Sequence, residues 1–167
     1  CYDWAEMSLT LPHIETALAS ANVAYEIWPC DETLADTANF CAHYNVSVDN
    51  SVNAILVQDK YNAENYALCL VTAADRLDVN GTVRKKLGAK KASFASSEMT
   101  TDVTAMEIGG VTPVGLPQGI RIWIDAKIMA LDYIILGGGN RTSKLKLDPA
   151  YFTDIAEAEI IENLSRQ

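Results

Sequence analysis

The chain has 167 residues, of which 49% are apolar and 21% are charged, and this is the composition of one ordinary globular domain. Its 13 Lys and Arg residues against 22 Asp and Glu residues give a formal charge of −9, which argues against a protein that holds nucleic acid by bulk positive charge. A chain of this length typically buries about 70% of its unfolded surface, so neither a disulfide nor a metal is needed for stability.

Apolar stretches are short throughout the chain. The run from Ile134 to Gly139 is far below the roughly 20 residues that a bilayer span needs. Residues 1–7 carry Asp3 and Glu6 and lack a basic start, so they do not resemble a signal peptide. We therefore expect a cytoplasmic protein with no membrane partner, in which residues 1–7 form an extension.

The cysteines and histidines do not suggest a metal site. The four cysteines are widely separated and form no C-x-x-C pair, and the two histidines add no ligand spacing typical of zinc. Cys41 and Cys69 lie among apolar neighbours and are expected to be buried structural thiols. We expect no metal and no cofactor.

Helices and strands are predicted to mix along the chain. Apolar spacing and capping signals predict helices over 8–21, 33–44 with Thr33 as the cap, 79–87 and 96–103, a helical turn over 126–131, and a closing helix from Asp148 to about Leu164. β-forming segments predict strands over 24–28, 53–58, 65–72, 91–94, 120–125, 133–136 and 143–147, the second and third forming an antiparallel hairpin. Strict βαβ alternation is missing, so we predict a single mixed α/β domain rather than a doubly wound sheet.

Two glycine-rich segments are the most specific local features. The segment 109–117 combines three glycines and two prolines in nine residues and cannot form a regular element. Its N–H groups could bind a phosphate or a developing oxyanion, or it could be a tight connection over a sheet edge. Gly137, Gly138 and Gly139 follow a strand and form either a ligand-facing loop or a turn. Asp125 ends an apolar strand, where it either caps the next helix or projects into a site.

A basic run stands out in this acidic chain. Five of the 13 basic residues fall within eight positions: Arg84, Lys85, Lys86, Lys90 and Lys91. Such a run can contact phosphates while the overall negative charge suppresses nonspecific binding, or it can be a solvated helix face. No serine or cysteine stands at a sequence spacing from His43 that indicates a nucleophile, so we predict no catalytic triad.

Several segments, taken in order, carry a resemblance to a known family. The most specific is Gly-Gly-Val-Thr-Pro-Val-Gly-Leu-Pro at 109–117, and further matches lie at 37–46, 53–57, 76–80, 83–95, 124–125 and 137–141. Together they resemble the YbaK or prolyl-tRNA-synthetase-associated editing domain family, which includes free-standing aminoacyl-tRNA deacylases. The resemblance covers roughly Ile14 to Leu164, so we expect residues 1–167 to form a single domain of this type.

The resemblance implies a fold, an activity and a set of site residues. It implies a compact, partly rolled mixed sheet with flanking helices, and a pocket for the aminoacylated 3′ end of a tRNA. The implied activity is hydrolysis of a misattached amino acid in trans, in the service of translation fidelity, with an aminoacyl-tRNA synthetase as a further partner. The residues implied for substrate binding are Pro113, Gly115, Asp125, Gly137, Gly138 and Gly139, and those for tRNA contact are Arg84, Lys85, Lys86, Lys90 and Lys91.

One departure from the family concerns its active-site lysine at the start of the first hairpin strand. In this chain the matching position is Asn53, whose amide offers only a neutral hydrogen bond, about half as strong as a charge-assisted one. The nearest later lysine, Lys60, would lie roughly 23 Å along an extended strand and is a poor substitute. Asn53 could instead satisfy backbone groups at the strand end.

The expected mechanism uses no protein nucleophile. N–H groups from Gly109 and Gly110, or from Gly137 and Gly138, would stabilise the oxyanion, and Asn53 would orient the ester or the ribose. Water, or a reactive side chain of the amino acid itself, would attack the carbonyl. The alternatives are a binding or regulatory module that has lost the reaction together with the lysine, and a scaffold with no nucleotide ligand.

Overall fold

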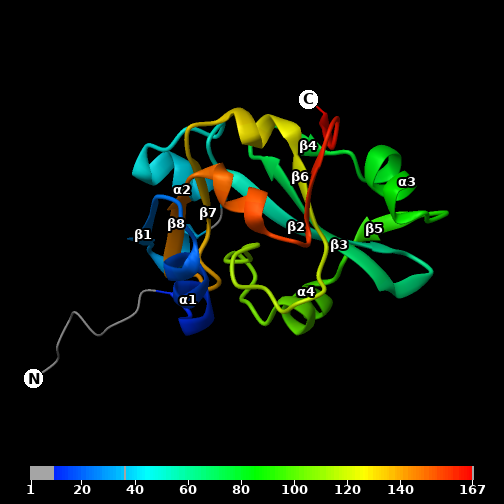
Figure 1. Ribbon diagram of the computed structural model, residues 1–167, viewed down its shortest axis with the longest axis horizontal. Helices are drawn as coiled ribbons and strands as arrows, with labels where there is room; N and C mark the ends of the chain where they lie inside the picture. The colour runs from blue at the N-terminus through cyan, green and yellow to red at the C-terminus, as the bar shows by residue number, and fades with distance from the viewer. Residues whose placement is uncertain (1–9, 36, 167) are drawn as a thin grey trace, which may run out of the picture.

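The computed structural model describes residues 10–35 and 37–166, which form a mixed α/β fold (Figure 1). The helical segments are α1 (Pro12–Ser20), η2 (Glu32–Leu34), α2 (Thr37–Tyr44), η3 (Val79–Val83), α3 (Arg84–Leu87), α4 (Ser97–Thr104), η4 (Ala126–Ala130) and η5 (Pro149–Asp154). The strands are β1 (Tyr25–Pro29), β2 (Val52–Asp59), β3 (Asn62–Thr72), β4 (Arg76–Leu77), β5 (Ala92–Phe94), β6 (Ile122–Asp125), β7 (Ile134–Gly137), β8 (Ser143–Leu147), β9 (Ala158–Ile161) and β10 (Ser165–Arg166). The predicted fold class is confirmed.

The two larger sheets lie side by side and meet at the start of β2, and β10 and β4 form a separate two-stranded sheet. The five-stranded sheet has the order β5-β2-β3-β6-β9, in which β6 runs parallel to β3 and β9 and the other pairs are antiparallel. The three-stranded sheet, β1-β8-β7, is antiparallel. A parallel bridge between Ser51 and Ile135 links the two. In Figure 1 the smaller sheet lies at the left with α1 and α2, and the larger sheet lies at the right.

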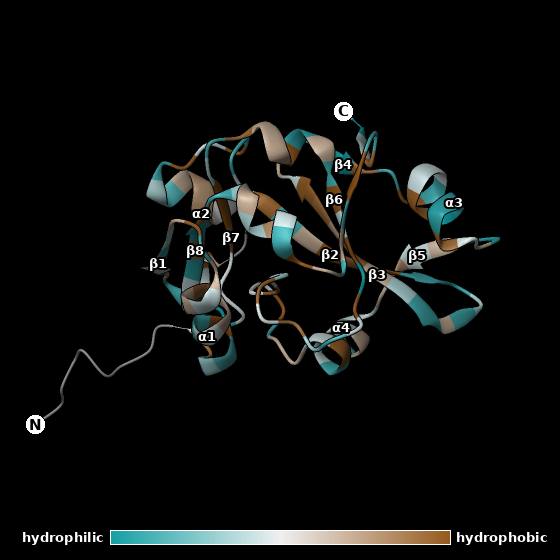
Figure 2. Cartoon of the chain, viewed as in Figure 1, coloured by the Kyte–Doolittle hydropathy of each residue, from teal (hydrophilic) through white to brown (hydrophobic). Residues whose placement is uncertain are grey.

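The predicted hairpin is confirmed and is longer than expected. β2 and β3 pair antiparallel from Val52 opposite Thr72 to Asp59 opposite Asn62. The inner half of β3 is buried because it lies between β2 and β6, whereas the residues near the turn are exposed. Figure 2 shows this as a hydrophilic tip and a hydrophobic inner end. The hairpin therefore supplies both core residues and an accessible strand edge.

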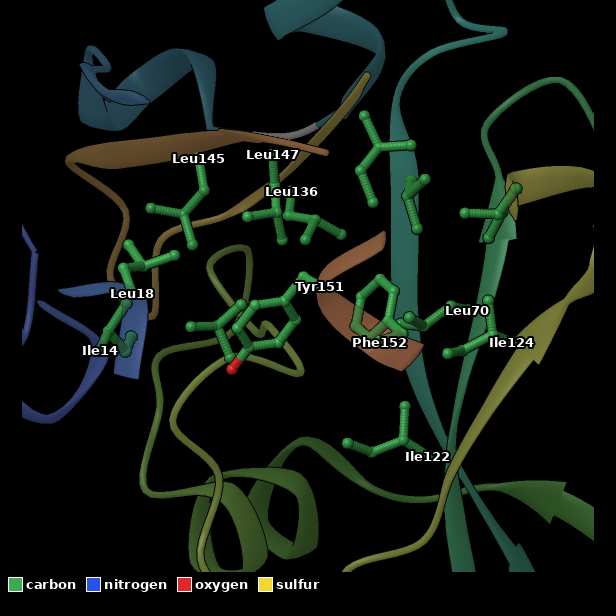
Figure 3. Packing of buried hydrophobic residues seen from close by; sticks show 14 of the residues in the cluster. Ile14, Leu18, Leu70, Ile122, Ile124, Leu136, Leu145, Leu147, Tyr151 and Phe152 are labelled. Carbon is green, nitrogen blue, oxygen red and sulfur yellow. The ribbon is translucent and has the colours of Figure 1, made fainter. Parts of the chain in front are cut away.

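The largest hydrophobic core lies between the two sheets and α1. Ile14 and Leu18 of α1 pack with apolar side chains from both sheets, and Tyr151 and Phe152 of η5 lie among them (Figure 3). Each fully buried side chain of this size contributes about 1.5–3 kcal/mol relative to an exposed one. A second cluster, which includes Leu87 and Trp123, lies beneath α3 on the larger sheet. The first core therefore holds the two sheets together, and the second packs α3 against the larger sheet.

The segment predicted as a helix over 33–44 is divided into two pieces, and its predicted cap was wrong. Asp31 is the cap, because its carboxylate accepts hydrogen bonds from the Thr33 N–H at 2.9 Å and the Thr33 hydroxyl at 2.7 Å. The first piece ends after one 3₁₀ turn, where the carbonyl of Ala35 accepts a hydrogen bond from Lys144 at 2.8 Å. Asn45, with a φ of 57°, follows the end of α2, as expected.

The closing helix predicted from Asp148 to Leu164 was also wrong. Asp148 caps only the short η5, accepting a hydrogen bond from the Ala150 N–H at 2.9 Å. The chain then becomes extended, and β9 adds to the free edge of β6 with Ile124 opposite Ile160. Pairing with a sheet edge therefore replaced the helix that the apolar spacing suggested.

Other predicted elements are present with small changes in their bounds. Gly88, at φ 69°, ends α3, and the Ser96 hydroxyl caps α4 by accepting a hydrogen bond from the Met99 N–H at 3.1 Å. The strands at β1, β5, β6, β7 and β8 are confirmed, and 109–117 is irregular. Among the described residues, no helix combines the length and apolar character required to cross a membrane.

Replacing Leu145 by alanine tests the main core. Leu145 is fully buried, so we expect Leu145→Ala to lower the free energy of unfolding by about 2–5 kcal/mol, through lost burial and the cavity left behind. Urea denaturation followed by circular dichroism measures the change. The control is Tyr61→Ala, at a side chain that is 72% exposed, which should change stability by no more than about 0.5 kcal/mol. Equal effects for the two variants would contradict the placement of this core.

Candidate functional site

A cavity of about 250 Å³ opens along one edge of β2. It is lined by residues from three places that are distant in the sequence: β2, the segment from β5 to the 109–117 loop, and the facing ends of β7 and β8. The lining residues are Val52, Asn53, Ala54, Ile55, Leu56, Ala95, Thr100, Ile108, Gly109, Val111, Gly137 and Lys144. Asn53, Gly109 and Gly137, all predicted as site residues, are thus brought together.

The cavity exists because β2 changes neighbours along this edge. At its start the strand is bridged to β7 through Ser51 and Ile135, and only from Val57 onward does it pair with β5. No strand pairs with the intervening part of this edge in the described portion of the chain. Its side chains alternate between the two faces, so both polar and apolar groups of β2 reach the cavity wall.

Glycines allow the surrounding backbone segments to approach closely. A Cβ at Gly137 would lie 2.6 Å from the carbonyl oxygen of Gly110, so no side chain fits between β7 and the 109–117 loop. Gly109 has a φ of 90°, which disfavours any residue with a side chain. A Cβ at this position would also collide with the guanidinium of Arg141. The two glycines therefore shape one wall of the cavity.

The N–H groups of these glycine segments differ in their availability. The Gly110 N–H donates to the Glu107 carbonyl at 2.9 Å, and the Gly139 N–H donates to the Gly110 carbonyl at 2.5 Å. The Gly109 N–H has no hydrogen-bond acceptor among the described residues. Of the amides predicted as oxyanion donors, Gly110 is therefore committed elsewhere and Gly109 is available.

Lys144 is a cavity residue that the sequence analysis missed. It is only 6% exposed, its ammonium donates to the Ala35 carbonyl at 2.8 Å, and it lies 5.3 Å from the centroid of the Phe40 ring. In the sheet it is paired with Gly137, on the strand next to the one that approaches β2. Successive side chains of a strand point to opposite faces, so Lys144 lies on the face of β8 opposite the core residues Leu145 and Leu147. This alternation was the only feature of the sequence that distinguished Lys144. Nothing in the local spacing of residues showed that β7, the partner of β8, is bridged to the start of β2.

Asp125 is buried but lies outside this cavity. Its carboxylate caps η4, accepting a hydrogen bond from the Lys127 N–H at 3.5 Å, and it also accepts one from the Ser165 hydroxyl. The capping role, one of its two predicted alternatives, is therefore what the geometry shows. The prediction that Asp125 binds substrate is not supported by its position.

The remaining predicted glycine and proline residues surround the cavity rather than line it. Gly138 packs against Ser143, and Gly139 lines a different hollow together with Leu11. Pro113 is buried, and a Cβ at Gly115 would lie 3.1 Å from the backbone of α1. These residues position the loops and do not themselves face the space beside Asn53.

The basic run combines two side chains that are bonded to other residues of the fold with three further exposed lysines. Arg84 donates to the carbonyls of Asn80 at 2.9 Å and Ala89 at 3.3 Å, and Lys86 forms an ion pair with Glu159 at 2.9 Å. Lys85, Lys90 and Lys91 are exposed. All five lie outside the cavity that contains Asn53, and the proposed tRNA contact by this run stays a prediction.

The described thiols are structural in character. Cys30, Cys41 and Cys69 are free and buried, and burial raises the pKa of Cys69 to about 12. Burial also raises the pKa of Cys30, although the positive charge of Lys144 opposes this effect. No group of three or more metal-binding side chains occurs in the part of the chain that the structure describes.

Comparisons with known proteins point to one family. Residues 31–155 match the model of the aminoacyl-tRNA editing domain. A proline–tRNA ligase of Brachyspira hyodysenteriae is 29% identical over 119 residues, which cover 71% of this chain but 19% of the ligase. The chain therefore spans about a fifth of that relative. The uncharacterized protein YwhH of Bacillus subtilis is 22% identical over 110 residues, covering 66% of this chain and 70% of YwhH.

Solved structures share the fold. The crystal structure of hypothetical protein APE2540 aligns with a TM-score of 0.80 and 19% identity, covering 92% of this chain and 99% of that one. A protein described as a candidate trans-editing enzyme for prolyl-tRNA synthetase aligns with a TM-score of 0.76 and 18% identity, covering 94% and 99% of the two chains. The resemblance found in the sequence is thus confirmed at the level of family and fold.

Replacing Asp125 separates a structural role from a role in the cavity. We expect Asp125→Ala to lower the free energy of unfolding by about 0.5–2 kcal/mol, because η4 loses its cap and the Ser165 hydroxyl loses its acceptor. Asp125→Asn keeps an oxygen acceptor and should recover most of this loss. Chemical denaturation measures both variants. Unchanged stability in Asp125→Ala would refute the capping role.

Proposed function

Since this chain belongs to the aminoacyl-tRNA editing domain family, we propose that it hydrolyses the ester of a mischarged tRNA, in trans to the synthetase that made it. One observation carries the proposal: Asn53, Gly109 and Gly137 share a cavity with the buried cation of Lys144. The aminoacyl-tRNA 3′ end is the proposed partner, and the cytoplasm is the expected compartment.

The size of the cavity favours an amino acid rather than a complete nucleotide. At about 250 Å³ it lies below the roughly 300–1,000 Å³ of typical sites for drug-sized ligands. Apolar side chains such as Ile55, Ile108 and Val111 line it beside the polar Asn53 and Thr100. This lining suits the side chain of a small amino acid whose ester lies near Asn53.

The residues around the cavity support hydrolysis by water. A water molecule adds to the ester carbonyl, the carbon–oxygen bond to the ribose breaks, and a proton passes to the departing ribose hydroxyl. In this mechanism the Gly109 N–H, which has no acceptor among the described residues, would stabilise the negative charge that develops on the carbonyl oxygen. Asn53 can orient the ester or the ribose through hydrogen bonds.

The presence of Lys144 favours an active deacylase over a binding or regulatory module that has lost the reaction. Asparagine at position 53 lacks the positive charge of the family's lysine on β2, and Lys144 on β8 contributes a lysine to the lining of the same cavity. Within a poorly solvated site, a fixed cation stabilises developing negative charge much more strongly than it does in water. The Ala35 carbonyl and the Phe40 ring hold this ammonium group in place.

A panel of mischarged tRNAs tests the proposal. Single-turnover release of labelled amino acid is measured for each member, beginning with mischarged prolyl-specific tRNA because a proline–tRNA ligase is among the relatives. We expect Asn53→Ala and Lys144→Met each to reduce hydrolysis at least about tenfold, since loss of one oxyanion-stabilising group typically costs about 2.7–4 kcal/mol. No release by the wild-type protein from any member would refute the proposal.

Matched variants separate a chemical effect from a structural one. Lys146→Met removes a lysine from the same strand, but this side chain lies outside the cavity and pairs with Glu26 at 3.4 Å. It should hydrolyse like the wild type. If the wild type binds aminoacyl-tRNA without hydrolysing it, and Asn53→Lys creates activity, the natural chain is the binding or regulatory module instead.

A further inference from the structure

A second, larger cavity adjoins the first on the surface of the five-stranded sheet. It has a volume of about 520 Å³ and shares the residues Asn53 and Ile55 with the smaller cavity. Its other lining residues include Asp75, Arg76, Phe94 and Arg166. A ligand whose reacting end lies beside Asn53 can therefore continue into this second space.

Phe94 offers an accessible aromatic face at the rim of this cavity. The side chain is 59% exposed, which is unusual for a phenylalanine in a strand. Phe94 pairs with Val57 of β2, and Asn53 and Ile55 lie on the same face of that strand because alternate residues share a face. The four residue steps from Asn53 to Val57 span about 13 Å, so Phe94 lies a short distance beyond the proposed position of the ester.

Two arginines lie side by side in the lining of the same cavity. Arg76 of β4 and Arg166 of β10 are directly opposite in an antiparallel pair, an arrangement in which like charges repel. Neither side chain makes a hydrogen bond or an ion pair with any of the described residues. An anionic ligand between them would relieve this repulsion.

The acidic groups nearby are largely engaged elsewhere. Asp75 also lines the cavity, but its carboxylate bonds Lys127 at 3.1 Å and accepts a hydrogen bond from Thr72 at 3.4 Å. The Asp78 carboxylate caps η3 by accepting from the Thr82 N–H at 3.1 Å, and this hydrogen bond, together with the positive charge of Arg166, is among the causes that lower its pKa. Among the described residues neither arginine forms an ion pair with these carboxylates, so both cations and the aromatic face can contact a ligand.

We propose that this second cavity binds the unpaired nucleotides at the 3′ end of the tRNA, with a base stacked on Phe94 and a phosphate between Arg76 and Arg166. The inference rests on the proposed function, because the amino acid would occupy the smaller cavity. Proteins bind single-stranded RNA with this combination of an aromatic platform and arginines. On this proposal the principal tRNA contact lies in the second cavity and not at the basic residues of 84–91.

Binding of nonacylated RNA tests the subsite without requiring hydrolysis. The probe is a short, fluorescently labelled single-stranded RNA that ends in CCA. We expect Phe94→Ala to raise its Kd at least about fivefold, and Phe94→Trp to keep wild-type affinity because stacking is retained. Tyr25→Ala, at an exposed aromatic residue on β1, is the control and should bind like the wild type.

The salt dependence of the same binding tests the phosphate contact. Arg76→Gln and Arg166→Gln should each reduce the slope of log Kd against log salt by about 0.7, the value expected for one phosphate contact in a single strand. Unchanged affinity in Phe94→Ala, or unchanged slopes in both arginine variants, would overturn the proposal even if the protein hydrolyses aminoacyl-tRNA.

Two competitors define the ligand further. A blunt RNA duplex and free nucleoside monophosphates should each compete with the labelled RNA much less well than unlabelled single-stranded RNA ending in CCA. Equal competition by the duplex or by a free mononucleotide would overturn the assignment to a single-stranded 3′ end. A wild-type protein that binds the RNA through Phe94 but hydrolyses no ester would refute only the proposed deacylase activity.

Discussion

The junction between the two sheets at the start of β2 is the constraint on which the candidate site depends. Asn50 fixes this junction twice: its carbonyl accepts a hydrogen bond from the Ile135 N–H at 2.8 Å, and its side-chain amide donates to the Tyr133 carbonyl at 3.0 Å. The adjacent Ser51 hydroxyl contacts the buried Cys41 thiol at 3.1 Å. Because β2 is held to β7 only here, its edge diverges from the smaller sheet and leaves the cavity beside Asn53 open.

Close packing of backbone on backbone gives this cavity its shape. The loop that carries Gly109 and Gly110 passes directly over Gly137, and the hydrogen bond from the Gly139 N–H to the Gly110 carbonyl holds it there at 2.5 Å. Side chains at these positions would push the loop away from β7. Within the loop the Gly110 N–H donates to the Glu107 carbonyl, whereas the Gly109 N–H has no acceptor among the described residues and Gly109 lines the cavity. The backbone contacts of the loop therefore determine which of the two amides can bind a ligand.

Local charge, rather than the net charge, governs what the protein can bind. At physiological salt the Debye length is about 8 Å, so acidic groups elsewhere on the surface have little influence on a cation in the site. The total of −9 still opposes extended contact with a nucleic acid duplex. A buried Lys144 and an opposed pair of arginines are compatible with this acidic surface, since they act on one short segment of a ligand. The cations most evident in the sequence, at 84–91, are in part used within the fold.

The sequence by itself determined the class of fold, most strands and helices, and the family. Hydrophobic alternation identified the β2–β3 hairpin, and the glycine and proline pattern at 109–117 identified an irregular loop, because both signals arise from the local preferences of the backbone. The matches to the family then indicated Asn53 as a position of interest.

Only the tertiary structure decided which of the candidate residues meet. The pairing of β8 with β7, and of β7 with the start of β2, places Lys144 in the cavity with Asn53, although 91 positions separate them in the chain. Residues expected in the closing helix instead pair with β6 as β9, and Asp125 caps η4 and does not line the cavity. Contacts between distant segments depend on sheet order and on packing, and neither is encoded in the spacing of neighbouring residues.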